Sequence, residues 1–129
     1  MKVQGKSLEQ AQKLLKDAKA VEEAGAFAIT LECVPAVLAK IITEQAKAIT
    51  IGIGAGHDCD GQVLVYQDML GYTGGFVPKF VKKYADLHSV MLEAFKQYKK
   101  ECEDRSFPEA SQTYEINDDV MDKLFEPEF

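Results

Sequence analysis

The 129-residue sequence has no tryptophan, only three cysteines and two histidines, and no arginine before Arg105. The cysteines Cys33, Cys59 and Cys102 are odd in number and form no C-x-x-C pair, which argues against a disulfide framework or a zinc site. Because arginine is so scarce, the chain lacks the basic footprint that binding to a phosphate backbone requires. We therefore expect reduced thiols and no nucleic-acid partner.

Long hydrophobic runs are also missing. No uninterrupted apolar stretch approaches 18 residues, and the N-terminus lacks the charged-then-apolar order of a secretory signal. We therefore expect no membrane partner and predict a cytoplasmic protein.

Acidic residues are concentrated at the C-terminal end. The formal net charge is −6, yet residues 103–129 hold nine Asp and Glu against two Lys and Arg, while residues 1–102 hold 12 against 13. From Arg105 onward the hydrophobic periodicity is also lost. This composition predicts a loose or partner-dependent tail.

The remaining sequence alternates between helix and strand patterns. Ser7 and Gln10 form a capping-box pattern that predicts a helix from about Ser7 to Ala24, which Gly25 ends. The apolar segment 27–34 predicts a strand covered on both faces, as in a parallel sheet.

Further along, Pro35 suits the first turn of a helix that extends to about Gln45, with Val37, Leu38, Ile41 and Ile42 facing inward. Residues 48–56 predict a second buried strand. The apolar run 63–70 fits a strand, or a strand that turns into a helix. A helical pattern over 78–102 predicts one bent helix or two short ones.

This order predicts βα units and a parallel sheet, because parallel strands need crossover connections. Two or three strands leave both edges of the sheet unpaired, and a closed barrel of eight units takes about 250 residues. If the fold is a barrel, the chain holds only part of it.

One carboxylate interrupts the first predicted strand. Glu32 stands among uncharged residues just before Pro35. A charged group in an apolar strand is costly unless it is paired, protonated or used, and α/β enzymes place their chemistry at the carboxyl ends of strands. Two interpretations stay open: Glu32 is a functional residue, or it pairs with a lysine of a neighbouring element.

The glycines of IGIGAG, at 51–56, follow G-x-G-x-G and match neither nucleotide-binding motif. Because glycines have no side chain, either another layer of side chains or a ligand can pack close to the backbone here. Gly54 and Gly56 are thus candidate pocket-lining residues. The polar cluster 57–60 lacks metal-ligand spacing and favours a turn in which Asp side chains accept backbone N–H groups. We interpret His88 as a surface or helix-cap histidine.

Three blocks resemble the ketopantoate hydroxymethyltransferase family: LECVP at 31–35, IGIGAG followed by DGQ within 51–62, and PKFVKKYADL at 78–87. The resemblance extends from about Val3 to Pro108 and corresponds to roughly the second half of that family's (β/α)8 barrel. It implies an α/β fold, the C-terminal part of a TIM-type barrel that is incomplete in this chain, over residues 1–108. The acidic tail over 109–129 departs from the family's histidine-containing ending.

The resemblance also implies a reaction. The family transfers a hydroxymethyl group from 5,10-methylenetetrahydrofolate to 2-oxoisovalerate, giving ketopantoate for pantothenate and coenzyme A biosynthesis. Its glutamate base falls on Glu32, which would be the proton acceptor. The family's Mg²⁺ would hold the enolate, but its carboxylate ligands lie in the missing first half, so we assign no metal ligand to this chain.

Two partners follow from this interpretation. The chain would need the N-terminal half of the barrel for activity, so we expect the isolated chain to be inactive. Its open apolar edges also predict a homo-oligomer. The alternative is a non-catalytic half-barrel interaction module that self-associates through these edges.

Overall fold

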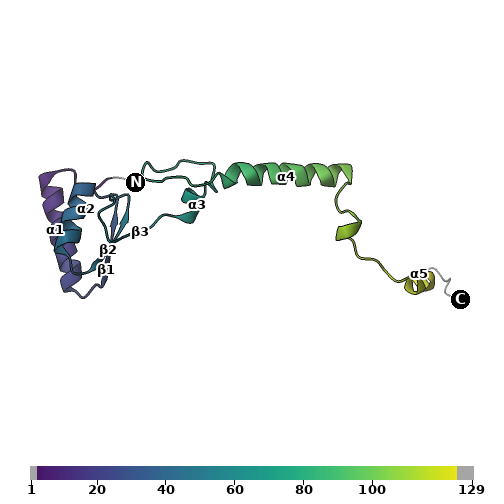
Figure 1. The fold of residues 1–129 in the computed structure, drawn as a ribbon, viewed down its shortest axis with the longest axis horizontal. Helices are drawn as coiled ribbons and strands as arrows, with labels where there is room; N and C mark the ends of the chain where they lie inside the picture. Colours follow the sequence, from purple (N-terminus) through teal and green to yellow (C-terminus); the bar gives the residue numbers. More distant parts are fainter. Residues whose placement is uncertain (1–2, 125–129) are drawn as a thin grey trace. The chain divides into compact units, whose positions relative to one another are not determined.

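The computed structural model describes residues 3–124, which divide into two compact units with the boundary between His88 and Ser89. The first contains α1 (Leu8–Glu23), β1 (Ala28–Glu32), α2 (Ala36–Gln45), β2 (Ile49–Ile53), β3 (Gly61–Gln62) and α3 (Tyr66–Met69) (Figure 1). Helix α4 (Leu87–Asp104) begins at the end of this unit and is followed by η1 (Ala110–Gln112) and α5 (Asp118–Leu124). No helix in the described range is long and apolar enough to cross a bilayer.

The ends of α1 confirm the sequence prediction to within a residue. Ser7 is the N-cap, and its Oγ accepts the backbone N–H of Gln10 at 3.2 Å. The Gln10 side chain accepts the backbone N–H of Lys6, one position before the cap, which completes a variant of the capping box. Gly25 follows the helix with φ +98°, a conformation that favours glycine.

The three strands form a parallel sheet in the order β1-β2-β3. Leu31 is opposite Gly52, Glu32 is opposite Ile53, and Ile51 is opposite Gly61. Opposite residues in parallel strands face the same side, so this register assigns every side chain to a face. The predicted mixed α/β fold with a small parallel sheet is confirmed.

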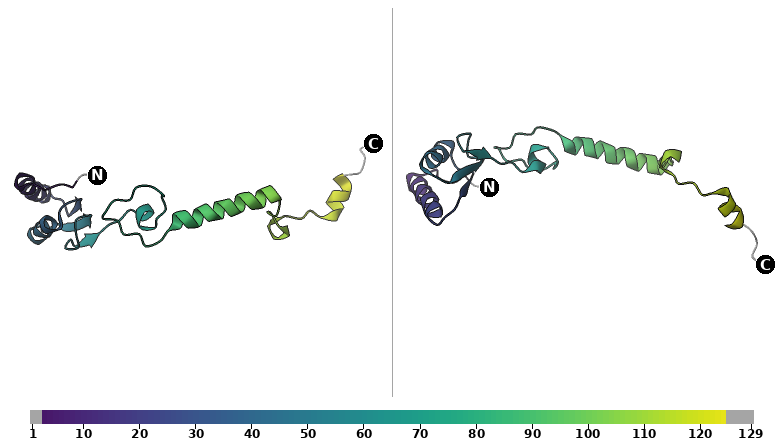
Figure 2. Two further views of the ribbon diagram at one scale, coloured as in Figure 1. Left: turned by 90° about the horizontal axis from the view of Figure 1, so that it is seen from above. Right: turned by 60° about the horizontal axis from the view of Figure 1, so that its bottom comes forward.

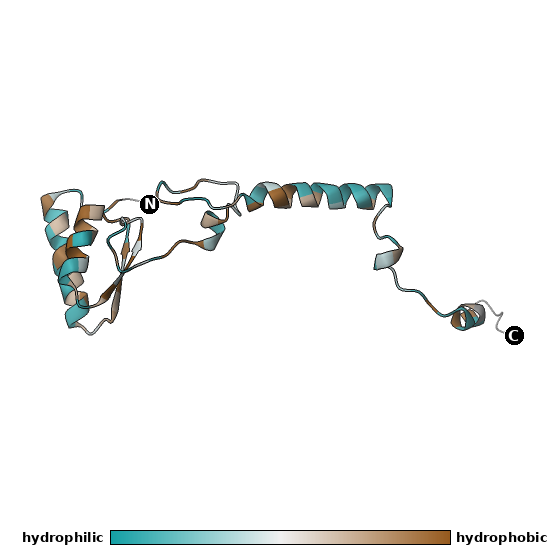
Figure 3. Ribbon diagram, viewed as in Figure 1, coloured by the Kyte–Doolittle hydropathy of each residue, from teal (hydrophilic) through white to brown (hydrophobic). Residues whose placement is uncertain are grey.

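Helices α1 and α2 lie side by side on one face of this sheet (Figures 1 and 2). The core between them is built from Leu31, Val34, Leu38, Ala39, Ile42 and Ala55. Figure 3 shows the hydrophobic residues that run through α2 and the strands. Burying a large aliphatic side chain of this kind contributes about 1.5–3 kcal/mol, so this layer holds the first unit together.

The opposite face of the sheet is open, and the expectation of strands covered on both faces is wrong for this chain. Thr30 and Glu32 are exposed, and Ile49 is 54% exposed. The first two helices both pack on the same side, and covering the second face takes further helices or closure into a barrel. Val37, expected to face inward, is 74% exposed.

The helix expected from Pro78 begins only at Leu87. In the preceding segment, the backbone N–H of Tyr84 donates to the Met69 carbonyl at 2.7 Å, and that of Leu87 donates to the Leu70 carbonyl at 3.0 Å. These bonds tie the segment to the end of α3 instead of to a helix of its own. Residues 63–70 contain no strand, because β3 ends at Gln62, so the strand expected over this range is wrong. The helix that was expected as its continuation is present as α3.

The second unit has little buried surface. On α4, the aromatic residues Phe95 and Tyr98 are 64% and 55% exposed, so they do not form a core within the described residues. One edge-to-face contact joins the rings of Tyr98 and Phe107, whose centroids lie 5.6 Å apart. Residues 125–129 of the predicted tail lie outside the described range.

Candidate functional site

The carboxyl end of β1 is fixed by backbone hydrogen bonds on both sides. The N–H of Cys33 donates to the Ile53 carbonyl at 3.0 Å, and the Cys33 carbonyl accepts the N–H of Gln4 at 3.0 Å. Cys33 has φ +55°, a left-handed conformation that costs a non-glycine residue about 1–2 kcal/mol. Strained residues of this kind are typical of functional sites.

Glu32 immediately precedes this strained residue. Its side chain alternates with those of Leu31 and Cys33, which are buried, so it lies on the open face of the sheet, where it is exposed. No hydrogen bond or ion pair joins its carboxylate to another of residues 3–124. The lysine partner considered from the sequence is therefore absent from the described part of the chain, and a functional role for Glu32 stays a prediction.

The glycines after β2 allow close packing. Gly54 has φ +65°, and a Cβ there would lie 2.7 Å from Cδ1 of Phe80. Gly56 has φ +83°, and a Cβ there would lie 2.5 Å from Cβ of Ala36. Both positions need glycine for conformation and for space, because a Cβ would meet Phe80 at Gly54 and Ala36 at Gly56.

A cavity of about 530 Å³ opens where these segments meet. Its walls come from residues 33–36 after β1, from Gly54 and Gly56, and from Lys79 and Phe80, with Val3 and Gln62 completing them. The two predicted pocket-lining glycines thus line a cavity, whereas Glu32 is not among its lining residues. Lys79 and Phe80 were missed because the sequence placed them on a helix.

The loop from Gly54 to Asp60 connects β2 to β3 without a helix, and Asp60 anchors its far end. Oδ2 of Asp60 accepts the backbone N–H of Thr50 at 2.8 Å and the Thr50 hydroxyl at 3.0 Å. These hydrogen bonds from Thr50, first from its backbone and then from its side chain, lower the pKa of the Asp60 carboxyl. An Asp side chain does accept a backbone N–H here, although from β2 and not from its own turn.

A metal site does not form from this cluster. His57 Nε2 lies 3.7 Å from a carboxylate oxygen of Asp58, but no three His, Cys, Asp or Glu side chains among those that the structure describes converge as metal ligands. We therefore assign no metal ligand to the described residues. His88 is exposed at the second position of α4, as the sequence analysis interpreted it.

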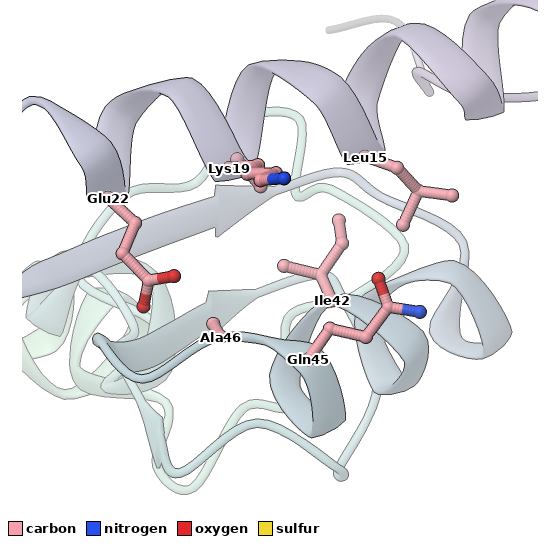
Figure 4. A pocket seen from close by; sticks show the side chains of 7 residues that line it. Leu15, Lys19, Glu22, Ile42, Gln45 and Ala46 are labelled. Atoms are coloured by element: carbon pink, nitrogen blue, oxygen red, sulfur yellow. The ribbon is translucent and has the colours of Figure 1, made fainter.

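A smaller cavity of about 200 Å³ lies between α1 and α2 (Figure 4). Its one carboxylate, Glu22, accepts the backbone N–H groups of Lys47 and Ala48, the latter at 2.7 Å. The carboxylate therefore satisfies donors of the loop that leads into β2. We interpret this cavity as part of the helix layer, where Glu22 has a structural role.

Comparison with known proteins gives a consistent result. The sequence profile of the family described as "Ketopantoate hydroxymethyltransferase" matches residues 1–110. Curated proteins named 3-methyl-2-oxobutanoate hydroxymethyltransferase are 57% identical in Clostridium novyi, 56% in Enterococcus faecalis and 54% in Carboxydothermus hydrogenoformans, each over 124 residues. Each match covers 96% of this chain but 45% of the relative. The chain thus spans about half the length of these relatives, and the matched stretch extends well into the acidic tail.

Proposed function

The chain belongs to the ketopantoate hydroxymethyltransferase family, and we propose that it supplies the base-bearing half of a hydroxymethyltransferase. The proposed reaction converts 2-oxoisovalerate to ketopantoate, with 5,10-methylenetetrahydrofolate as the one-carbon donor, in the cytoplasm. The observation that carries this proposal is Glu32: an unpaired carboxylate at the carboxyl end of β1, on the open face of the sheet.

Glu32 is the proposed general base. Its carboxylate takes the C3 proton of 2-oxoisovalerate, and the electron pair of the C–H bond forms the enolate. Water converts the one-carbon unit to formaldehyde, which breaks both of its C–N bonds and releases tetrahydrofolate. The enolate carbon then forms the new C–C bond with the formaldehyde carbon, and the formaldehyde oxygen takes a proton and becomes the hydroxyl group. A positioned base contributes about 10²–10⁴-fold to such a reaction, provided that it is within hydrogen-bonding reach of the proton.

The open face of the sheet supports a barrel. In a (β/α)8 barrel one side of each strand packs on the helices and the other side fills the interior. Here α1 and α2 cover one side, while Thr30, Glu32 and the three isoleucines of β2 occupy the other. We propose that residues 1–108 form the C-terminal part of such a barrel and that residues 109–129 form an acidic extension.

The N-terminal half of the barrel is the proposed partner. It would pair with the free edge of β1, cover the open face and complete the substrate site. Because the described residues form no metal cluster, any magnesium ligands are assigned to that half. The free edges also support the proposal of homo-oligomers.

The test is to mix this chain with the N-terminal part of the Clostridium novyi relative and to follow ketopantoate formation by NMR, in buffer that contains magnesium. We expect turnover from the mixture and none from either part alone. If the two parts form a complex that has no activity, the proposal is wrong, and a non-catalytic interaction module becomes the better account.

A further inference from the structure

The 530 Å³ cavity carries an unbalanced positive charge. Among the described residues that line it, Lys79 is the only charged one, and none is an aspartate or a glutamate. We infer that this cavity binds the one-carbon donor of the proposed reaction, with Lys79 as the counter-ion of a carboxylate on that donor. The inference rests on the proposed function and adds to it a binding site and two residues.

The volume of the cavity favours 5,10-methylenetetrahydrofolate, which is larger than the other reactant, 2-oxoisovalerate. Sites for small molecules commonly measure roughly 300–1,000 Å³ and have mostly apolar walls with a few polar groups. A cavity of about 530 Å³ falls within that range and exceeds what a five-carbon oxoacid fills. A donor with a ring system and a carboxylate matches both the apolar walls and the single cation.

Lys79 is free to serve as that cation. Its side chain is exposed, and no ion pair or hydrogen bond joins its amino group to another residue in the described range. By contrast, the Lys82 amino group lies 5.0 Å from the centre of the Tyr84 ring. The positive end of the α2 dipole, at Ala36 in the same wall, adds to the attraction for an anion.

Phe80 supplies a flat apolar surface beside this charge. Its ring lies against Gly54, where the missing Cβ leaves room for it, and it is half-buried. Aromatic side chains pack well against planar ring systems. Lys79 and Phe80 thus offer adjacent contacts for a carboxylate and for a ring.

Lys79 and Phe80 lie in a loop whose two ends are joined by backbone hydrogen bonds. The Tyr84 and Leu87 N–H groups donate to the carbonyls of Met69 and Leu70, and the His88 N–H donates to the Gly71 carbonyl at 2.8 Å. These bonds join the two ends of a loop over residues 72–83. Because the base of the loop is fixed, Lys79 and Phe80 are held over the cavity before a ligand arrives, which reduces the entropy lost on binding.

The experiment compares Lys79→Met with Lys83→Met in the complex of this chain with the N-terminal part of the Clostridium novyi relative. Lys83 is an exposed cation of the same loop that does not line the cavity, so it is the matched control. Two readouts are needed: tetrahydrofolate binding by calorimetry, and exchange of the C3 proton of 2-oxoisovalerate in D₂O, which requires no donor.

We expect Lys79→Met to weaken tetrahydrofolate binding about tenfold or more, as loss of a charge-assisted contact does, and to leave C3 exchange unchanged. Lys83→Met should change neither. If Lys79→Met slows exchange or weakens binding of 2-oxoisovalerate instead, Lys79 serves the oxoacid and the inference is wrong.

The two proposals can fail separately. If the unmodified complex does not bind tetrahydrofolate, the cavity inference is overturned, even where C3 exchange proceeds. If tetrahydrofolate binds in a manner that depends on Lys79 but no transfer or exchange occurs, the cavity inference stands and the proposed function falls.

Discussion

Replacing Thr50 by valine tests how the loop between β2 and β3 is held. Thr50 is fully buried, and its hydroxyl donates to Oδ2 of Asp60 at 3.0 Å, accepts the Asp60 N–H at 3.2 Å and lies 2.9 Å from Oγ1 of Thr43. Valine has nearly the same shape, so the change removes these contacts without opening a cavity.

The expected decrease in the free energy of unfolding follows from the three contacts of the Thr50 hydroxyl. A net hydrogen bond contributes about 0.5–1.5 kcal/mol, and one to a charged group about 1.5–3 kcal/mol. Asp60 is exposed and can regain water, which offsets part of the loss. We therefore expect the free energy of unfolding to fall by about 2 kcal/mol, which moves the urea midpoint by about 1 M for an m-value near 2 kcal/mol/M.

The assay is urea unfolding of the chain followed by circular dichroism. Thr30→Val is the matched control, because Thr30 is an exposed threonine on the open face of the same sheet. The control should change stability by less than about 0.5 kcal/mol. If Thr50→Val lowers stability no more than the control does, the Thr50 hydroxyl does not hold the loop.

Two further predictions concern the same end of the sheet. Gly54→Ala places a Cβ 2.7 Å from the Phe80 ring at φ +65°, so it should lower stability by about 1–2 kcal/mol and weaken tetrahydrofolate binding in the complex. Gly75→Ala, where nothing lies within 4 Å, should do neither. For Asp60→Asn we expect a stability deficit that depends on pH: the lowered pKa of Asp60 stabilises the fold above the unfolded carboxyl pKa of about 3.9, and this contribution is lost as pH falls through the folded value. A deficit that stays constant between pH 7 and pH 3 would contradict this assignment.

Local signals in the sequence predicted the first unit well. The Ser7 cap, the Gly25 stop and the Pro35 helix start are each decided by a few neighbouring residues, and each lies where the sequence placed it. The parallel pairing followed from the alternation of strands and helices. Gly54 and Gly56, which glycine spacing marked as candidates, lie in a cavity wall, and a ligand contact for them stays a prediction.

The conformation of the segment before α4 could not be predicted from local sequence signals. Phe80 and Tyr84 have helical spacing, but the backbone of this segment is bound to the end of α3 and its Phe80 ring fills the space over Gly54. Those partners are distant in sequence, so periodicity alone could not reveal them. The open face around Glu32 could not be predicted for a similar reason. The apolar composition of the strands suits a sheet that is covered on both faces, and the described residues cover only one face.

The proposed function depends on Glu32 as the base of a half-barrel transferase. The most direct test is NMR-monitored exchange of the C3 proton of 2-oxoisovalerate in D₂O with magnesium, using the complex with the N-terminal part of the Clostridium novyi relative. Glu32→Gln should slow exchange by at least about 100-fold, whereas the exposed Glu44→Gln should leave the rate unchanged. Exchange that continues at the unmodified rate in Glu32→Gln would contradict the account.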